Sequence, residues 1–197
     1  KMKLKQRNVG SKDIEKKILI VCEGARTEPS YFKKFKANAK CEVVGAGCNT
    51  VSVVEKALDM FSTGKFKEAW CVFDRDSFTK DRVKSALALA RKNNINIAFS
   101  NESFELWYVL HFAYLDTKIT RGDYVKALTG YLGKPYKKND DNMYQILLKN
   151  QHKAIERAKR LYNEMLPPGA CECDSYPYTT IHTLVERLNK LGREIGS

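Results

Sequence analysis

The stretch ILIVCEG, at residues 18–24, decides the fold. It holds five consecutive apolar residues, three of them β-branched, and then a glutamate and a glycine. A short apolar run of this kind is typical of a strand that is buried on both faces, as strands of a parallel sheet are. Gly24 allows a tight turn after the strand. We therefore expect residues 18–22 to form an interior strand with Glu23 at its carboxyl end.

Strand-like and helix-like segments alternate through the first hundred residues. This alternation predicts βαβ units with right-handed crossovers, and so an α/β fold of the Rossmann kind with a mostly parallel sheet flanked by helices. N-caps at Thr27 and Thr50 and a stop at Gly64 are expected for the first two helices. The expected strands are 18–22, 41–47, 68–73 and 95–100, and the expected helices are 28–39, 51–64 and 80–94.

The second half of the chain shows only helical patterns from Phe104 onward. No long polar linker separates the two halves, so we expect a helical portion that packs on the α/β core. This gives three parts: a basic N-terminal segment (1–17), the core (18–115) and the helical C-terminal portion (116–197).

The charge of the chain is strongly positive. Its 197 residues include 35 Lys and Arg against 23 Asp and Glu, a formal net charge of +12, which favours polyanions such as nucleic acid as partners. No apolar run is long enough to span a bilayer, and no secretory signal is visible, so a cytoplasmic protein without membrane contact is expected. The six cysteines show no zinc-binding spacing and are expected to be reduced.

Acidic side chains follow two of the expected strands. Glu23 follows the first, and Asp74 and Asp76 follow the third in CVFDRDS (71–77). Side chains alternate along a strand, so Asp74 and Asp76 share one side while Arg75 points away in a structural role. Carboxylates that meet at the carboxyl edge of a parallel sheet suit Mg²⁺ or Mn²⁺. The alternative is that the aspartates begin a turn and cap the helix at residue 80, and that Glu23 is merely solvated.

The segment SFELWYVLHFAYL (103–115) is apolar nearly all round, which predicts a buried helix. A charge on such a helix needs a partner or a metal ion. Glu105 fits either a structural ion pair or a further carboxylate of the site, and His111 is expected to be a hydrogen-bonded core histidine. The basic residues nearest in sequence to the expected site, and so candidates for binding phosphate, are Arg26, Lys33 and Lys34.

Four segments together resemble the RloB-like (AbiLii-type) proteins of bacterial phage defence. They are ILIVCEGARTEPSYF, WCVFDRDSF, IAFSNESFELWYVLHF and TTIHTLVERL, in this order. The resemblance implies a Toprim catalytic domain, in which Glu23 acts as a general acid or base and Asp74 and Asp76 bind magnesium. The chain departs from the pattern at Glu102, where proline is usual, and at SYPYTT (175–180), where NPST is usual.

The resemblance further implies a metal-dependent nuclease that cuts RNA, such as tRNA, or DNA, and acts in abortive infection beside an AAA/ABC-type ATPase. This chain has no Walker A loop, so ATP hydrolysis would belong to the partner. Catalytic roles are then expected for Glu23, Asp74, Asp76 and Glu105, and assembly as a homo-oligomer is possible. Two alternatives are a catalytically silent interaction or sensor module and a glycosyltransferase. A glycosyltransferase gives no reason for Glu23 or for so basic a surface.

Overall fold

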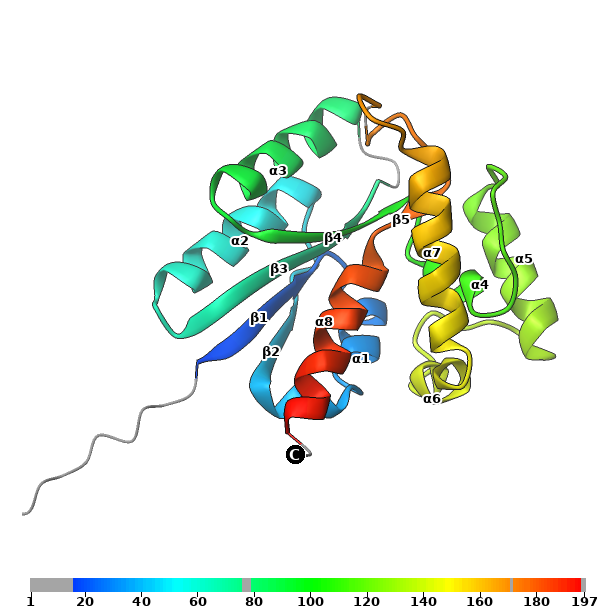
Figure 1. Ribbon diagram of the computed structural model, residues 1–197, viewed down its shortest axis with the longest axis horizontal. Helices are drawn as coiled ribbons and strands as arrows, with labels where there is room; N and C mark the ends of the chain where they lie inside the picture. Colours follow the sequence, from blue (N-terminus) through cyan, green and yellow to red (C-terminus); the bar gives the residue numbers. More distant parts are fainter. Residues whose placement is uncertain (1–15, 76–78, 171, 196–197) are drawn as a thin grey trace, which may run out of the picture.

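The computed structural model describes residues 16–75, 79–170 and 172–195. A five-stranded sheet forms its centre, and helices cover both faces and continue beyond one edge (Figure 1). The strands are β1 (Lys17–Cys22), β2 (Cys41–Gly45), β3 (Phe66–Asp74), β4 (Asn96–Asn101) and β5 (Tyr178–Thr179). The helices are α1 (Thr27–Phe32), η1 (Lys36–Lys40, a 3₁₀ helix), α2 (Thr50–Ser62), α3 (Lys80–Lys92), α4 (Glu105–Leu110), α5 (Arg121–Leu132), α6 (Met143–Leu148), α7 (Gln151–Met165) and α8 (Ile181–Glu194).

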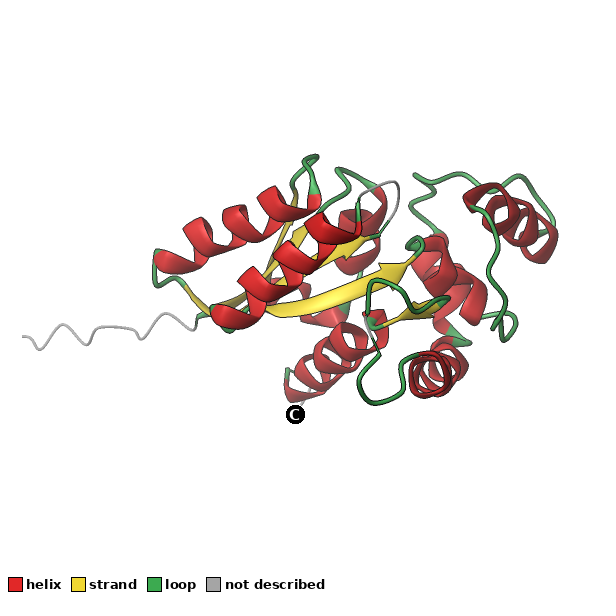
Figure 2. Cartoon of the chain, turned by 90° about the horizontal axis from the view of Figure 1, so that it is seen from above, coloured by secondary structure: helices red, strands yellow, loops and turns green. Residues whose placement is uncertain are grey.

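The strand order is β2-β1-β3-β4-β5, with the first four parallel and β5 antiparallel to β4. The predicted α/β fold with a mostly parallel sheet is therefore confirmed. Helices α2 and α3 cover one face of the sheet, and α1 and α8 cover the other (Figure 2). The chain moves from β1 outward to β2 and then returns to the other side of β1 as β3. In such a sheet, the crevice at the carboxyl ends of β1 and β3 is the favoured place for a ligand.

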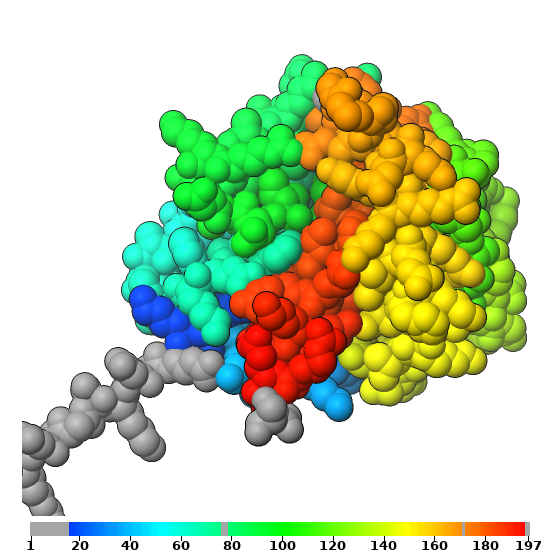
Figure 3. Space-filling model, in the orientation of Figure 1, coloured from blue at the N-terminus to red at the C-terminus, as the bar shows by residue number. Residues whose placement is uncertain are grey.

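Helix α8 packs between the two halves of the chain. It carries six buried residues on one side, among them Leu184, Leu188 and Leu191, and it packs against η1, β4 and α7. Figure 3 shows it, in red, between the blue-to-green portion and the yellow α6–α7 portion. Arg187 of α8 also pairs with Glu68 of β3, at 2.8 Å between Nη2 and Oε2. The last helix is thus part of the packing around the sheet.

Several predicted boundaries are wrong, each for a local reason. The helix expected over 28–39 ends at Phe32, because Phe35 takes an extended backbone (φ −68°, ψ 147°) and the chain turns through η1 into β2. Thr50 does not cap α2. Asn49 is the N-cap, and its side chain accepts a hydrogen bond from the Ser52 N–H at 3.2 Å. The two-residue strand β5 was not predicted, because it is too short to show an alternating pattern.

Other expectations on the helices are confirmed. Gly64 ends the turn after α2 with φ +71°, a conformation that glycine adopts readily. All six residues of α4 are buried, as its nearly all-apolar pattern predicts.

Cys22, Cys41 and Cys71 are buried thiols, and burial raises the pKa of Cys41 to about 11 and that of Cys71 to about 12. Within the described residues, no helix has the length and apolar character that crossing a membrane requires.

Candidate functional site

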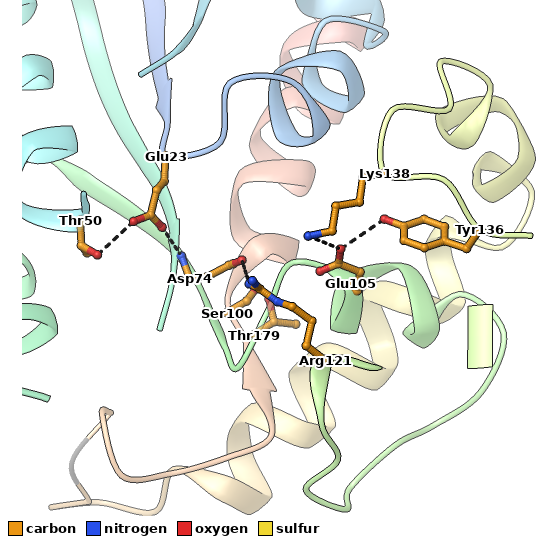
Figure 4. A network of polar contacts seen from close by, with 9 residues as sticks. All are labelled: Glu23, Thr50, Asp74, Ser100, Glu105, Arg121, Tyr136, Lys138 and Thr179. Carbon is orange, nitrogen blue, oxygen red and sulfur yellow. Dashed lines mark hydrogen bonds and ion pairs between the residues drawn. The ribbon is translucent and has the colours of Figure 1, made fainter. Parts of the chain in front are cut away.

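Glu23 lies directly after β1 and is held against β3. Its backbone N–H donates to the Val72 carbonyl at 2.8 Å. Its carboxylate accepts from the Thr50 hydroxyl (3.1 Å, Oε1) and from the Asp74 backbone N–H (3.1 Å, Oε2), as Figure 4 shows. The hydroxyl of Thr50 is therefore used to orient Glu23, which explains why Asn49 caps α2 instead. The structure brings Glu23 and Asp74 together at the point where the strand order reverses.

Asp74 ends β3 and is buried, with 8% of its surface exposed. Its Oδ2 lies 3.8 Å from the Arg121 Nη2 (Figure 4). Arg121 is the first residue of α5, where Thr120 and Asp123 form a capping box that fixes the start of the helix. Asp74 does not cap α3, because Thr79 occupies that position. A residue of the C-terminal half therefore brings positive charge to the carboxyl end of β3.

Glu105, the first residue of α4, is the second buried acid of this region, at 3% exposed. Its Oε1 lies 3.4 Å from the Tyr136 hydroxyl and 3.8 Å from the Lys138 Nζ (Figure 4). Both partners come from the loop between α5 and α6. The backbone N–H of Tyr136 donates to the Thr129 hydroxyl at 3.1 Å, which ties this loop to α5.

Glu28 is a fourth carboxylate, and it lies in the first turn of α1. It packs over Gly24: a Cβ added to Gly24 would stand 2.8 Å from the Cδ of Glu28, so the Glu28 side chain would have to shift. The absence of a side chain at Gly24 therefore makes room for a second carboxylate beside Glu23.

These side chains enclose a cavity of about 190 Å³. It lies at the carboxyl edge of the sheet and receives residues from the β1–α1 turn, β3, α1, α4, α5 and the α5–α6 loop. Four acidic and two basic side chains line it, so it is suited to a small charged group. Its lining residues are Glu23, Gly24, Thr27, Glu28, Asp74, Phe104, Glu105, Arg121 and Lys138.

The acids of this cavity repel one another. Burial raises the pKa of Asp74 well above its ordinary value, and the negative charges of Glu28 and Glu105 raise it further, whereas a backbone hydrogen bond from Phe104 acts in the opposite direction. Burial also raises the pKa of Glu28, and the charge of Glu105 adds to this effect. Such carboxylates hold protons readily, and a cation among them would be strongly attracted.

The donor set fits a hard divalent cation, because it consists of carboxylate oxygens. Within residues 16–75, 79–170 and 172–195, however, no three His, Cys, Asp or Glu side chains converge closely enough to form a metal site. The acids surround the cavity, and Arg121 and Lys138 lie beside Asp74 and Glu105. Side-chain rotation toward the cavity would be needed for several of them to bind one ion. Asp76, predicted as a metal ligand, lies outside the described residues.

Other predicted residues do not line the cavity. Arg26, Lys33 and Lys34 are exposed around α1, and none is among its lining residues. His111 is buried in the core, where its Nδ1 donates to the Trp107 carbonyl at 2.8 Å and burial lowers its pKa to about 4. This agrees with a hydrogen-bonded core histidine. The guanidinium of Arg75 lies 5.8 Å from the ring centroid of Tyr176.

Sequence reasoning missed Glu28, Arg121 and Lys138 as site residues. Glu28 had a usable signal, since an acid in the first turn of a helix after a strand-end glycine lies near that strand end. Lys138 belongs to the basic cluster KPYKK (134–138), but nothing in the cluster tells which lysine turns inward. Arg121 gave no local signal, because its contact with Asp74 depends on how α5 packs.

Comparison with known proteins gives one positive result. The family model for RloB-like proteins matches residues 18–188, which include the whole sheet except Lys17 and every residue of the cavity. Searches of curated proteins and of solved structures gave no match. Because the family model covers most of the chain, the protein belongs to the RloB-like family.

Proposed function

We propose that this protein is a Toprim-type, metal-dependent nuclease that hydrolyses phosphodiester bonds of RNA or DNA in bacterial defence against phage. The observation that carries the proposal is the acidic cavity at the strand-order reversal, where Glu23 and Asp74 end adjacent parallel strands and Glu28 and Glu105 face them. Membership of the RloB-like family supports the role in defence. An AAA/ABC-type ATPase as partner and an AbiLii-type system are further parts of the proposal.

In this proposal each side chain of the cavity has its own role in hydrolysis. A water molecule forms a new bond to phosphorus, one ester P–O bond breaks, and the leaving oxygen takes up a proton. Glu23, oriented by Thr50 and by the Asp74 N–H, handles the proton of the attacking water or of the leaving oxygen. Arg121 and Lys138 lie next to the acids and would neutralise charge on the phosphate.

A divalent cation, Mg²⁺ or Mn²⁺, held by Asp74 with Glu23, Glu28 and Glu105, would supply electrostatic stabilisation at the phosphorus. The carboxylates fit this task because they are desolvated and their charges are close together. Asp76, two residues after Asp74, is proposed as a further ligand on the strength of the sequence pattern.

The experiment compares wild type with Asp74→Asn on labelled tRNA, single-stranded RNA and DNA, with Mg²⁺ or Mn²⁺, alone and with the proposed partner ATPase. We expect Asp74→Asn to lower the rate of hydrolysis at least about 100-fold, the scale of a lost group in metal or acid–base catalysis. Asp59→Asn is the matched control, because Asp59 is exposed on α2, about 13 Å along the helix from Thr50, and does not line the cavity. Equal rates for wild type and Asp74→Asn on every substrate, together with normal phage defence by the variant, would contradict the proposal.

A second candidate is a catalytically silent module that senses or binds within the defence complex. The ion pair between Asp74 and Arg121 favours it, because a carboxylate held by an internal arginine has less need of a metal ion. Calorimetry with Mn²⁺ separates the two. Binding that is lost in Asp74→Asn supports the nuclease, and no binding by wild type supports the silent module.

A further inference from the structure

Tyr176 lies at the carboxyl edge of the sheet, close to the acidic cavity but not part of it. It belongs to the loop between α7 and β5, and its ring is half-buried. The Lys118 Nζ stands 4.1 Å from the centroid of the ring, and the Arg75 Cζ stands 5.8 Å from it. We call Arg75, Lys118 and Tyr176 the Tyr176 seat.

The backbone on both sides of Tyr176 is fixed. Before it, the Ser175 carbonyl accepts a hydrogen bond of 2.7 Å from the Asn101 Nδ2 at the end of β4. After it, Pro177 is buried and Tyr178 pairs with Asn101 in the sheet. In this segment Asp174 is exposed, and Ser175 and Tyr176 are partly exposed. The ring is therefore presented by an anchored segment.

The sheet register places the seat near Asp74. Asp74 is opposite Ser100, and Ser100 is opposite Thr179, on three adjacent strands. Neighbouring strands are about 4.8 Å apart, so the Cα atoms of Asp74 and Thr179 are separated by about 10 Å. Tyr176 comes three residues before Thr179, and Arg75 directly follows Asp74. A polymer over the acidic cavity would reach the seat within a short distance along its chain.

The chemistry of the seat matches a nucleotide. An aromatic ring with cations beside it binds a base by stacking and the adjoining phosphate by charge. Lys118 is exposed, so a base could replace its ammonium group on the ring and leave that group to pair with the phosphate. In a duplex the base faces are already stacked on their neighbours, so the seat selects an unpaired base.

We propose that the Tyr176 seat binds one unpaired base of the nucleic-acid strand whose phosphodiester lies over the acidic cavity. This inference rests on the proposed function and specifies it, because it makes the substrate a single-stranded segment, either a free strand or a loop. Arg75, expected from its strand position to be structural, becomes a substrate-binding residue.

The first test measures affinity in a metal-free buffer with chelator, where hydrolysis cannot consume the probe. The probes are a fluorescent single-stranded oligonucleotide and its duplex. We expect Tyr176→Ala to weaken single-strand binding about tenfold, the scale of one lost stacked base, and Tyr176→Phe to stay within about twofold of wild type. Tyr131→Ala is the control. Tyr131 is an exposed tyrosine ten residues beyond Arg121 on α5, about 15 Å along the helix, and it should change nothing.

The second test does not depend on a variant that must fold. A single strand carrying 5-iodouracil is irradiated with wild-type protein, and the cross-linked peptide is identified by mass spectrometry. Cross-linking at Tyr176 that disappears in the duplex supports the seat. The proposal is overturned if cross-links map elsewhere, if Tyr176→Ala binds single strands as wild type does, or if duplex binding falls equally.

The outcomes for the seat and for the nuclease are distinguishable. If hydrolysis depends on Asp74 but single-strand binding does not depend on Tyr176, the nuclease proposal is retained and the proposal for the Tyr176 seat is rejected. If single-strand binding depends on Tyr176 but no hydrolysis occurs under any metal condition, the proposal for the Tyr176 seat is retained and the nuclease proposal is rejected.

Discussion

At the scale of single residues, the acidic cavity is costly to fold. Asp74, Glu28 and Glu105 are each less than a tenth exposed, and a buried carboxylate loses hydration that its partners must replace. Arg121 and Lys138 supply part of this, each at 3.8 Å, a distance of ion pairing without a close hydrogen bond. The buried carboxylates therefore lower the stability of the fold, and groups of this kind are common where a protein binds an ion or a substrate.

The raised pKa of Glu28 leads to a prediction about pH. Because its pKa is higher in the folded than in the unfolded chain, the stability it contributes is present at low pH and is lost as the pH rises through the folded-state pKa. At neutral pH Glu28 therefore destabilises the metal-free protein. We expect Glu28→Gln to raise the melting temperature by a few degrees at neutral pH, and the gain to vanish near the ordinary carboxyl pKa of about 4.

Thermal unfolding followed by circular dichroism across this pH range checks the prediction. Glu55→Gln is the matched control, because Glu55 is exposed on α2, and its melting curve should follow that of wild type. A melting temperature of Glu28→Gln below that of wild type at neutral pH would show that Glu28 makes a stabilising contact instead.

Metal addition should act in the opposite direction on the wild-type protein. A ligand that binds only the folded state stabilises it by about 2.7 kcal/mol when its concentration is about 100 times Kd. For a chain of this length, that corresponds to a rise in melting temperature of about 5–10 °C. We expect this rise with Mn²⁺ for wild type and little of it for Asp74→Asn, measured by differential scanning fluorimetry. An equal rise in both proteins would place the bound ion outside the acidic cavity.

At the scale of elements, the turn after β1 depends on a glycine in the neighbouring strand. Gly45 ends β2, and a Cβ added there would lie 2.7 Å from the carbonyl oxygen of Ala25 and 2.9 Å from its Cα. These are backbone atoms, so the turn between Glu23 and α1 would have to move. The position of Glu23 therefore depends on the end of another strand.

We expect Gly45→Ala to cost about 1–3 kcal/mol of unfolding free energy, as overpacking does, and to reduce hydrolysis by shifting Glu23. Gly130→Ala is the matched control, because Gly130 lies within α5 with nothing within 4 Å of an added Cβ. It should stabilise the protein by about 0.5–1 kcal/mol, the difference between alanine and glycine in a helix. Urea unfolding measures both, and equal stability of the two variants would contradict the argument.

The elements also show how far the sequence could predict this structure. The strand-like runs at 18–22 and 68–73 predicted interior strands, and two of the acids after them, Glu23 and Asp74, do meet at one edge, because parallel strands end together. Contacts that depend on tertiary packing leave no pattern in the local sequence and could not be predicted from it. Arg121 lies close to Asp74 only because α5 packs beside α4. The two residues of β5 form a strand only because they pair with the edge strand β4.

At the scale of the whole molecule, the net charge of +12 predicts that nucleic-acid binding depends strongly on salt. Each phosphate contact with a single strand contributes about 0.7 to the slope of log K against log salt concentration. We expect Lys138→Ala to reduce the slope by about this amount. Lys126→Ala should leave it unchanged, because the Lys126 Nζ lies 3.5 Å from the Asp123 Oδ1 on the same helix and Lys126 does not line the cavity. Fluorescence anisotropy at several salt concentrations gives the slopes, and equal slopes for Lys138→Ala and wild type would place Lys138 outside the phosphate path.

The pairing of β5 with β4 also determines when the sheet is completed during synthesis. Residues 178 and 179 complete the sheet along β4, and α8 then packs against that part of the sheet. A nascent chain on the ribosome has neither element until those residues have emerged from the exit tunnel. The strand edge next to the acidic cavity stays open until then, and the Tyr176 seat has no anchor. If the protein is the nuclease proposed above, we expect the unfinished chain to leave the messenger and transfer RNA around it uncut while it is being translated.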